Sequence, residues 1–286
     1  AYKTREYAAQ DAARFVSVSV TGTACALACD HCGMNVLRGM VPLPQREESS
    51  LFDLCLNLRA RGARGILLSG GCDHQGRVPL LPHIADLKRV RDELGFTIRA
   101  HTGVVDERTA QALSDVDLDG AMIDLIGADE TIREVYHLDS TTADYERALA
   151  RLEAHRVPTI PHIILGLHYG RMLGEYHALE MVERHPPRYL VLIVLMPLYG
   201  TAMAGVTPPP LAEIDAFFQH ARARLPETPI MLGCARPVGK LKTEIDRCAV
   251  DAGLDGIAYP AEGIVAYAEA RGLEAKFHDA CWGVFW

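Results

Sequence analysis

Eight apolar segments of strand length alternate along this chain with segments of helical periodicity, and this alternation limits most strongly how the chain can fold. The strand-like segments are residues 16–20, 65–69, 97–100, 120–125, 159–165, 189–195, 229–232 and 256–259. The helical segments are residues 51–61, 84–93, 108–113, 145–155, 176–184, 211–225, 242–252 and 263–271. Most strand-like segments are apolar on both faces, as in a covered parallel sheet. The pattern predicts an α/β fold, a closed (β/α)8 barrel of the TIM type, with an open doubly wound sheet as the alternative.

The length and composition predict a single domain. The 286 residues are 49% hydrophobic and 23% charged, which is enough for one full-sized core, and the sequence has no long linker or low-complexity tract. Residues 1–286 are therefore predicted to form one barrel domain. The C-terminal tail, residues 273–286, ends in an apolar, aromatic stretch and is predicted to fold near the barrel mouth.

The charge argues against several classes of partner. A net charge of −8 without a basic run disfavours nucleic acid and anionic membrane surfaces as partners. The sequence contains neither an apolar run of about 20 residues nor a signal-peptide pattern at its start. Eight cysteines in such a chain indicate a reducing compartment, so we expect a cytoplasmic protein.

Three cysteines, Cys25, Cys29 and Cys32, lie in one short Cys-x3-Cys-x2-Cys loop after the first strand-like segment. A zinc knuckle would need Cys-x2-Cys pairs and a fourth local ligand, which this loop lacks. Three thiolates in a single loop instead predict an iron–sulfur cluster held at three corners, with one iron open for chemistry. A structural zinc site or unrelated core thiols are the alternatives.

Polar residues, glycines and thiols gather where the predicted strands end, which is where a parallel barrel places its active site. They are Gly70, Gly71 and Cys72 after the second strand, His101 after the third, Asp124 in the fourth, His162 and Gly166 in the fifth, and Cys234 and Arg236 after the seventh. The glycines could also be ordinary turns, Asp124 a helix cap, and the histidines hydrogen-bonded rim residues.

The cysteine spacing, with His31 just before the last cysteine, resembles the radical S-adenosylmethionine (SAM) superfamily. The resemblance implies that Cys25, Cys29 and Cys32 bind a 4Fe-4S cluster whose open iron binds SAM. An electron from that cluster cleaves SAM to methionine and a 5'-deoxyadenosyl radical in this superfamily. An electron donor such as ferredoxin or flavodoxin is implied as well.

The same resemblance implies roles for four residues at the strand ends. Gly70 and Gly71 would approach the amino group of SAM, Asp124 would contact SAM, and Gly166 would pack against its adenine.

The other five cysteines fall into two groups. Cys55 and Cys248 lie on the apolar faces of predicted helices and are expected to be core residues. Cys72, Cys234 and Cys281 could converge at the barrel mouth, and this predicts a second, auxiliary iron–sulfur cluster. Unrelated free thiols are the alternative.

A closer resemblance covers residues 133–152 and 232–236, which are similar to the matching segments of biotin synthases and their relatives. In biotin synthase a cysteine after the second strand and an arginine after the seventh bind the auxiliary cluster, and Cys72 and Arg236 match these positions. Two further auxiliary cysteines of that enzyme are absent, with His101 and His162 at those strands instead. The chain resembles most the biotin-synthase-like proteins that act in pairs as a lipoyl synthase.

This resemblance implies a radical SAM sulfurtransferase that inserts sulfur from the auxiliary cluster into an unactivated C–H bond of an octanoyl chain. The implied partners are an octanoyl-carrying protein or peptide and a second radical SAM protein. A single-cluster mutase of the methylornithine synthase or hydrogenase-maturation type is the alternative enzyme, and an iron–sulfur scaffold or electron carrier is the non-enzymatic one.

Overall fold

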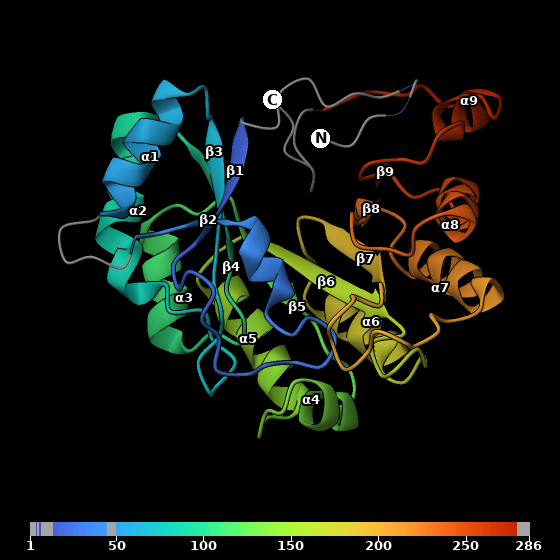
Figure 1. Cartoon of the computed structure of the whole chain (residues 1–286), viewed down its shortest axis with the longest axis horizontal. Helices are drawn as coiled ribbons and strands as arrows, with labels where there is room; N and C mark the ends of the chain where they lie inside the picture. The colour runs from blue at the N-terminus through green and yellow to red at the C-terminus, as the bar shows by residue number, and fades with distance from the viewer. Residues whose placement is uncertain (1–3, 5, 7–13, 45–49, 279–286) are drawn as a thin grey trace.

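The computed structural model describes residues 4, 6, 14–44 and 50–278. The chain forms a nine-stranded parallel sheet in the order β2-β1-β3-β4-β5-β6-β7-β8-β9, and the helices lie around its outside (Figure 1). The strands are β1 (Phe15–Ser19), β2 (Val41–Pro42), β3 (Gly65–Ser69), β4 (Thr97–His101), β5 (Gly120–Asp124), β6 (Thr159–Leu165), β7 (Leu190–Val194), β8 (Ile230–Leu232) and β9 (Gly256–Ile257).

Helices follow the strands as the sequence pattern predicts. They are α1 (Leu51–Ala60), α2 (Ile84–Leu94), α3 (Glu107–Asp115), α4 (Asp129–Val135), α5 (Thr142–Ala154), α6 (Glu175–Arg184), α7 (Leu211–Arg224), α8 (Lys240–Asp251) and α9 (Ile264–Glu269). Two short 3-10 helices, η1 (Asn35–Gly39) and η2 (Leu81–His83), complete the described secondary structure. The predicted α/β fold with eight strand–helix units is confirmed; β2 and α4 are additional elements.

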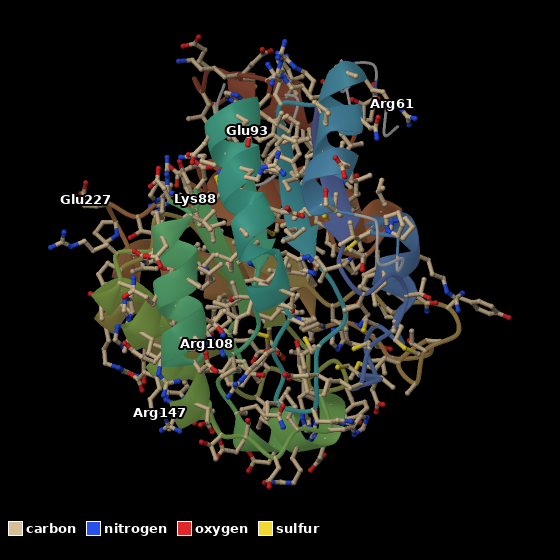
Figure 2. The ribbon with its side chains drawn as sticks, turned by 90° about the vertical axis from the view of Figure 1, so that its left-hand side faces the viewer. Arg61, Lys88, Glu93, Arg108, Arg147 and Glu227 are labelled. Atoms are coloured by element: carbon tan, nitrogen blue, oxygen red, sulfur yellow. The ribbon has the colours of Figure 1, made fainter. Side chains whose placement is uncertain are left out.

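The alternation of side chains along the strands builds two apolar layers. Outward-facing residues such as Ile66 and Leu68 on β3 pack under the helices in the main core. Inward-facing Leu67, Met122 and Ile160 belong to a second, smaller cluster inside the curved sheet. The outer faces of the helices carry charged side chains that point into solvent (Figure 2). The burial on both faces explains why the strand segments are apolar throughout.

The sheet departs from a closed barrel at one seam. Within the described residues no hydrogen-bonded ladder joins β9 to β1 or β2. Both edge strands have only two residues, and Pro42 in β2 has no N–H to donate to a further strand. The sequence could not reveal this opening, because an apolar segment looks the same in a closed and in an open parallel sheet.

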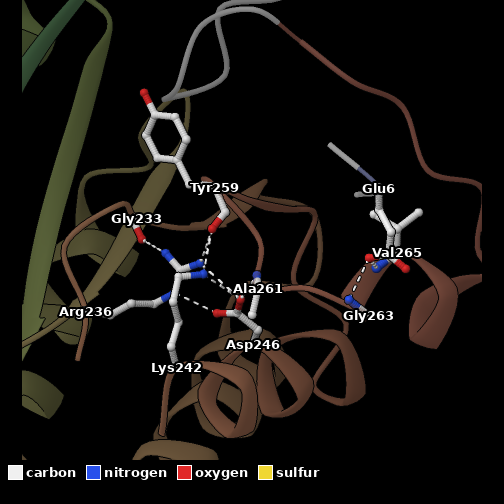
Figure 3. A network of polar contacts seen from close by, with 9 residues as sticks. All are labelled: Glu6, Gly233, Arg236, Lys242, Asp246, Tyr259, Ala261, Gly263 and Val265. Atoms are coloured by element: carbon white, nitrogen blue, oxygen red, sulfur yellow. Dashed lines mark hydrogen bonds and ion pairs between the residues drawn. The ribbon is translucent and has the colours of Figure 1, made fainter. Parts of the chain in front are cut away.

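Segments from both ends of the chain lie at the β9 side of the seam. The carboxylate of Glu6, which precedes β1, accepts hydrogen bonds from the backbone N–H groups of Gly263 (2.8 Å) and Val265 (3.3 Å) at the start of α9 (Figure 3). Residues 273–278 line, with β9 and α9, a cleft of about 630 Å³. Residues 279–286, including Cys281, lie outside the described residues. The predicted position of the whole tail therefore stays a prediction.

Within the described part of the chain, every helix is too short or too polar to cross a bilayer.

Candidate active site

The predicted cluster ligands Cys25, Cys29 and Cys32 lie in one loop, residues 21–34, directly after β1; we call it the cysteine loop. Its backbone turns tightly, with the N–H groups of Cys32 and Gly33 both donating to the carbonyl of Cys29 at 3.2 and 2.8 Å. Cys29 is buried, and the other two thiols are half-buried. The structure therefore places Cys29 and Cys32 on one tight turn, with Cys25 earlier in the same loop.

The Cys29 and Cys32 side chains are close enough to share a hydrogen bond. That bond lowers the pKa of the Cys32 thiol to about 7. The same bond, together with burial and the neighbouring thiols, raises the pKa of Cys29. One thiolate in this pair is thus readily available, and metal ligation requires thiolates.

The donor set of the cysteine loop fits an iron–sulfur cluster. A 4Fe-4S cluster is a cube that takes its ligands at separate corners. The loop carries three thiols, which can hold such a cluster at three corners. Among the described residues, no three Cys, His, Asp or Glu side chains are placed as the ligands of a single ion.

The end of β3 packs directly against the cysteine loop. Gly71 donates its N–H to Thr21 Oγ1 at 2.7 Å. A Cβ at Gly71 would lie 2.0 Å from the carbonyl oxygen of Ala24 and 2.5 Å from Cys25 Cα. Gly71 therefore permits a backbone contact with the loop that no other residue would allow.

Cys72 lies beside the cysteine loop. Its N–H points to Cys25 Sγ at 3.4 Å, and its carbonyl accepts a 2.9 Å hydrogen bond from Ala26. Burial, Cys25 and Asp124 raise the pKa of the Cys72 thiol to about 12. Cys72 thus joins the three motif cysteines as a fourth neighbouring sulfur.

The other predicted auxiliary ligands differ from Cys72 in exposure or lie outside the described residues. Cys234, which follows β8, is exposed, whereas Cys72 is half-buried. Cys281 lies outside the described residues. Cys55 is fully buried in α1 and Cys248 is half-buried against the core, so the prediction for these two is confirmed.

Arg236 is buried in a network that holds the β8–α8 loop to the segment after β9 (Figure 3). Its guanidinium donates to both carboxylate oxygens of Asp246, at 2.6 and 3.2 Å. It also donates to the carbonyls of Gly233 (2.5 Å) and Tyr259 (3.1 Å). Lys242 donates to the same Asp246 carboxylate at 3.1 Å. These bonds occupy Arg236, and its predicted role as an auxiliary ligand has no support from its contacts.

Asp124, at the end of β5, lies among buried polar side chains. Asp124 and His162 are opposite residues in the β5–β6 ladder. The ring centroids of His162 and His101 lie 5.3 Å apart. Burial, reinforced by His101, lowers the pKa of His162 to about 3, and burial also lowers that of His101. Both imidazoles are neutral near pH 7, so they can donate or accept a hydrogen bond without adding charge.

Two tyrosines near Asp124 were missed by the sequence reasoning. Tyr136 and Tyr145 are buried, and burial followed by the Asp124 charge raises the pKa of both. The Tyr136 ring lies 5.0 Å from that of His31 in the cysteine loop. An aromatic residue in a helical pattern is more often a core residue. The sequence therefore gave no indication that Tyr136 and Tyr145 lie at the site.

Gly166 directly follows β6 and has the left-handed conformation, with φ of 77°. Its N–H donates to the buried carboxylate of Glu175 at 2.8 Å, and Glu175 also accepts from Gly174 at 2.9 Å. A Cβ at Gly166 would lie 2.3 Å from the ring of Pro209. Gly166 is thus fixed by conformation and by packing, and Glu175 is a third residue that the sequence did not indicate.

A family model matches the part of the chain that contains the cysteine loop. Residues 19–171 match the family model described as the radical SAM superfamily. This segment runs from the end of β1 past β6 and includes the cysteine loop, Gly70, Gly71, Asp124 and Gly166. Comparison with the curated proteins found no match.

Several solved structures share the fold at low sequence identity. Methylornithine synthase (PylB) is 15% identical with a TM-score of 0.61, over 93% of this chain and 84% of that chain. The FeFe-hydrogenase maturase HydG from Carboxydothermus hydrogenoformans is 14% identical with a TM-score of 0.58, over 91% and 67%. Streptococcus suis SuiB is 12% identical with a TM-score of 0.57, over 81% and 51%.

The family match covers more than half of the 286 residues and contains all three motif cysteines. Membership implies a 4Fe-4S cluster and SAM as cofactors, and the cysteine loop fits that cluster. On these grounds the chain belongs to the radical SAM superfamily.

Proposed function

We propose that this chain is a radical SAM sulfurtransferase that inserts sulfur into an unactivated C–H bond of an octanoyl chain. The observation that carries the proposal is the position of the thiols. Cys25, Cys29 and Cys32 form one loop, and Cys72 and Cys234 follow strands β3 and β8 at the same ends of the parallel sheet. More thiols at this end than one cluster uses are what a sulfur-donating second cluster requires.

The bound cluster would supply the electron that cleaves SAM and so starts hydrogen abstraction. The residues of the chain would bind and orient the cofactors and exclude water from them. Gly71 allows the end of β3 to approach the cysteine loop, and the loop at Gly166 is fixed by Glu175. Tyr136 and Tyr145 are buried beside Asp124 and help to exclude water.

The proposal includes partners. We propose that the substrate chain is carried by a protein or peptide, that a second radical SAM protein takes part, and that ferredoxin or flavodoxin supplies the electron. The cluster sulfide is consumed when sulfur enters the substrate, so a single chain that is not resupplied would perform few turnovers.

A single-cluster radical SAM mutase is the second candidate, and two observations favour it. Arg236 is fully engaged by Asp246 and two backbone carbonyls. The neutral pair His101 and His162 beside Asp124 suits a small polar substrate better than an alkyl chain. In this case Cys72 and Cys234 would not bind a cluster.

Iron and sulfide content with Mössbauer spectra distinguishes the two candidates. The proteins to compare after anaerobic reconstitution are the wild type, the triple variant Cys25→Ala/Cys29→Ala/Cys32→Ala, the triple variant Cys72→Ala/Cys234→Ala/Cys281→Ala, and the control Cys55→Ala. Sulfur insertion predicts that each triple variant keeps one cluster and that the wild type holds more than about four irons. If the first triple variant loses all iron and the second keeps the wild-type iron content, the proposal of sulfur insertion is wrong. The single-cluster mutase then becomes the favoured function.

A further inference from the structure

We propose that Asp30 and Tyr169 form a latch that sets the distance between the cysteine loop and the loop at Gly166, and thereby positions SAM. Both are positioning residues, because neither belongs to the cysteine ligands or to Gly166 itself. The inference rests on membership of the radical SAM superfamily and not on sulfur insertion.

Asp30 lies between the cluster ligands Cys29 and Cys32, and two other loops use its carboxylate. The hydroxyl of Tyr169 donates to Asp30 Oδ2 at 2.7 Å. His137 Nε2, from the connection between α4 and α5, donates to Asp30 Oδ1 at 3.0 Å. Each carboxylate oxygen thus joins the cysteine loop to a different loop.

The backbone of Asp30 adds a third attachment. Its N–H donates to the carbonyl of Val135, the last residue of α4, at 3.0 Å. The cysteine loop is therefore fixed at its centre, beside the ligands, and not only at its two ends.

Tyr169 is linked rigidly to Gly166. The N–H of Gly170 donates to the Gly166 carbonyl at 2.8 Å, and the N–H of Tyr169 donates to the Leu167 carbonyl at 3.0 Å. Glu175 fixes Gly166 from the other side at 2.8 Å. The position of the Tyr169 hydroxyl therefore depends on the position of Gly166. The hydrogen bond from Tyr169 to Asp30 couples the position of Gly166 to that of the cysteine loop.

The backbone of the latch is strained. Ala28, His137 and Tyr169 are non-glycine residues in the left-handed region, with φ of 47°, 57° and 51°. This conformation is unfavourable for L-residues and persists where surrounding contacts enforce it, commonly at ligand sites. Three such residues lie in or beside this small network. This indicates that the surrounding contacts enforce its geometry, as is common at ligand sites.

A bound SAM molecule must meet both loops at once. By the resemblance to the superfamily, the cluster held by the cysteine loop would bind the methionine end of SAM, and Gly166 would pack against its adenine. The affinity for SAM therefore depends on the spacing of the two loops, whereas the three cluster ligands all lie in the cysteine loop. Weakening the hydrogen bond between Tyr169 and Asp30 should therefore lower the affinity for SAM without lowering the iron content.

The test is Tyr169→Phe, which removes only the hydroxyl, with Tyr176→Phe on α6 as the matched control. The readouts are iron content, the dissociation constant for SAM, and the SAM-induced change in the electron paramagnetic resonance spectrum of the reduced cluster. We expect Tyr169→Phe to keep the wild-type iron content and to bind SAM about tenfold more weakly, as for the loss of one hydrogen bond to a charged group. The control should match the wild type.

A second variant pair separates positioning from folding. Asp30→Asn keeps an acceptor for Tyr169 and should retain much of the SAM affinity, whereas Asp30→Ala should weaken SAM binding at least as much as Tyr169→Phe. Unchanged SAM affinity in Tyr169→Phe, or loss of iron in that variant, would overturn the latch. Failure of the wild type to bind SAM would instead count against the function of the chain as a radical SAM enzyme.

Discussion

The guanidinium of Arg236 donates to both oxygens of the Asp246 carboxylate, at 2.6 and 3.2 Å, and neither side chain reaches solvent. The backbone N–H of Ala261 donates to the same carboxylate at 2.7 Å, and the Tyr259 carbonyl accepts from Arg236 at 3.1 Å. The pair thereby joins the ends of β8 and β9, beside the open seam of the sheet. Arg236 supports the fold at a position where the resemblance to biotin synthase would place a cluster ligand.

Replacing Arg236 by Ala should destabilise the protein without removing the first cluster. The buried carboxylate of Asp246 would lose its main partner, which costs about 3–5 kcal/mol in the free energy of unfolding. Urea unfolding measures this loss. As a control, Lys88→Ala breaks an exposed pair with Asp92 and should change stability by less than about 0.5 kcal/mol. A stable Arg236→Ala protein with altered cluster spectra would instead identify Arg236 as a ligand.

Replacing Gly71 by Ala should impair cluster assembly. The added Cβ would lie 2.0 Å from the Ala24 carbonyl oxygen and 2.5 Å from Cys25 Cα, and both are backbone atoms that cannot move without displacing the loop. We expect less than about half of the wild-type iron after anaerobic reconstitution, because Cys25 moves away from the other thiols. Gly205→Ala, where nothing lies within 4 Å of the added Cβ, is the control. Equal iron in both variants would contradict the proposed contact.

The buried imidazole of His162 should make stability fall as the solution becomes more acidic. Burial holds its pKa near 3 in the folded protein, against 6.5 for an ordinary histidine. Between these values the unfolded chain binds a proton that the folded chain does not, so stability decreases as the pH drops from 6.5 towards 3. One such group contributes up to about 1.4 kcal/mol per pH unit.

Urea unfolding between about pH 7 and pH 5 tests this linkage. His162→Gln should show a shallower decrease than the wild type, by up to one proton, because glutamine does not titrate. Gln219→Ala on the exposed face of α7 changes no titrating group and should keep the wild-type slope. Identical slopes in the wild type and His162→Gln would show that folding does not lower the pKa of His162.

The strand–helix order was predictable from the sequence because each buried strand is a compact apolar run and each helix repeats at three or four residues. The two-residue strand β2 was too short to give such a signal. The opening beside β9 depends on hydrogen bonds between chain segments, which no local pattern encodes. The sequence therefore predicted the elements of the fold but not the closure of the sheet.

Site residues could be predicted from the sequence where their type and spacing are uncommon outside functional sites. Three closely spaced cysteines and the paired glycines at the end of β3 stand out in the sequence. Asp30 and Tyr169 do not, because they lie 139 residues apart and each is an ordinary surface residue type. Asp246 is a carboxylate within a helix, and only the packing of the folded chain shows that it is buried against Arg236.

The central claim is that the cysteine loop holds the cluster that cleaves SAM, and product analysis tests it most directly. The reconstituted wild type and the triple variant Cys25→Ala/Cys29→Ala/Cys32→Ala would be incubated anaerobically with SAM and a strong reductant, and 5'-deoxyadenosine and methionine would be quantified. The account predicts both products from the wild type and neither above background from the variant. Equal product formation by the two proteins, or none from an iron-loaded wild type, would contradict it.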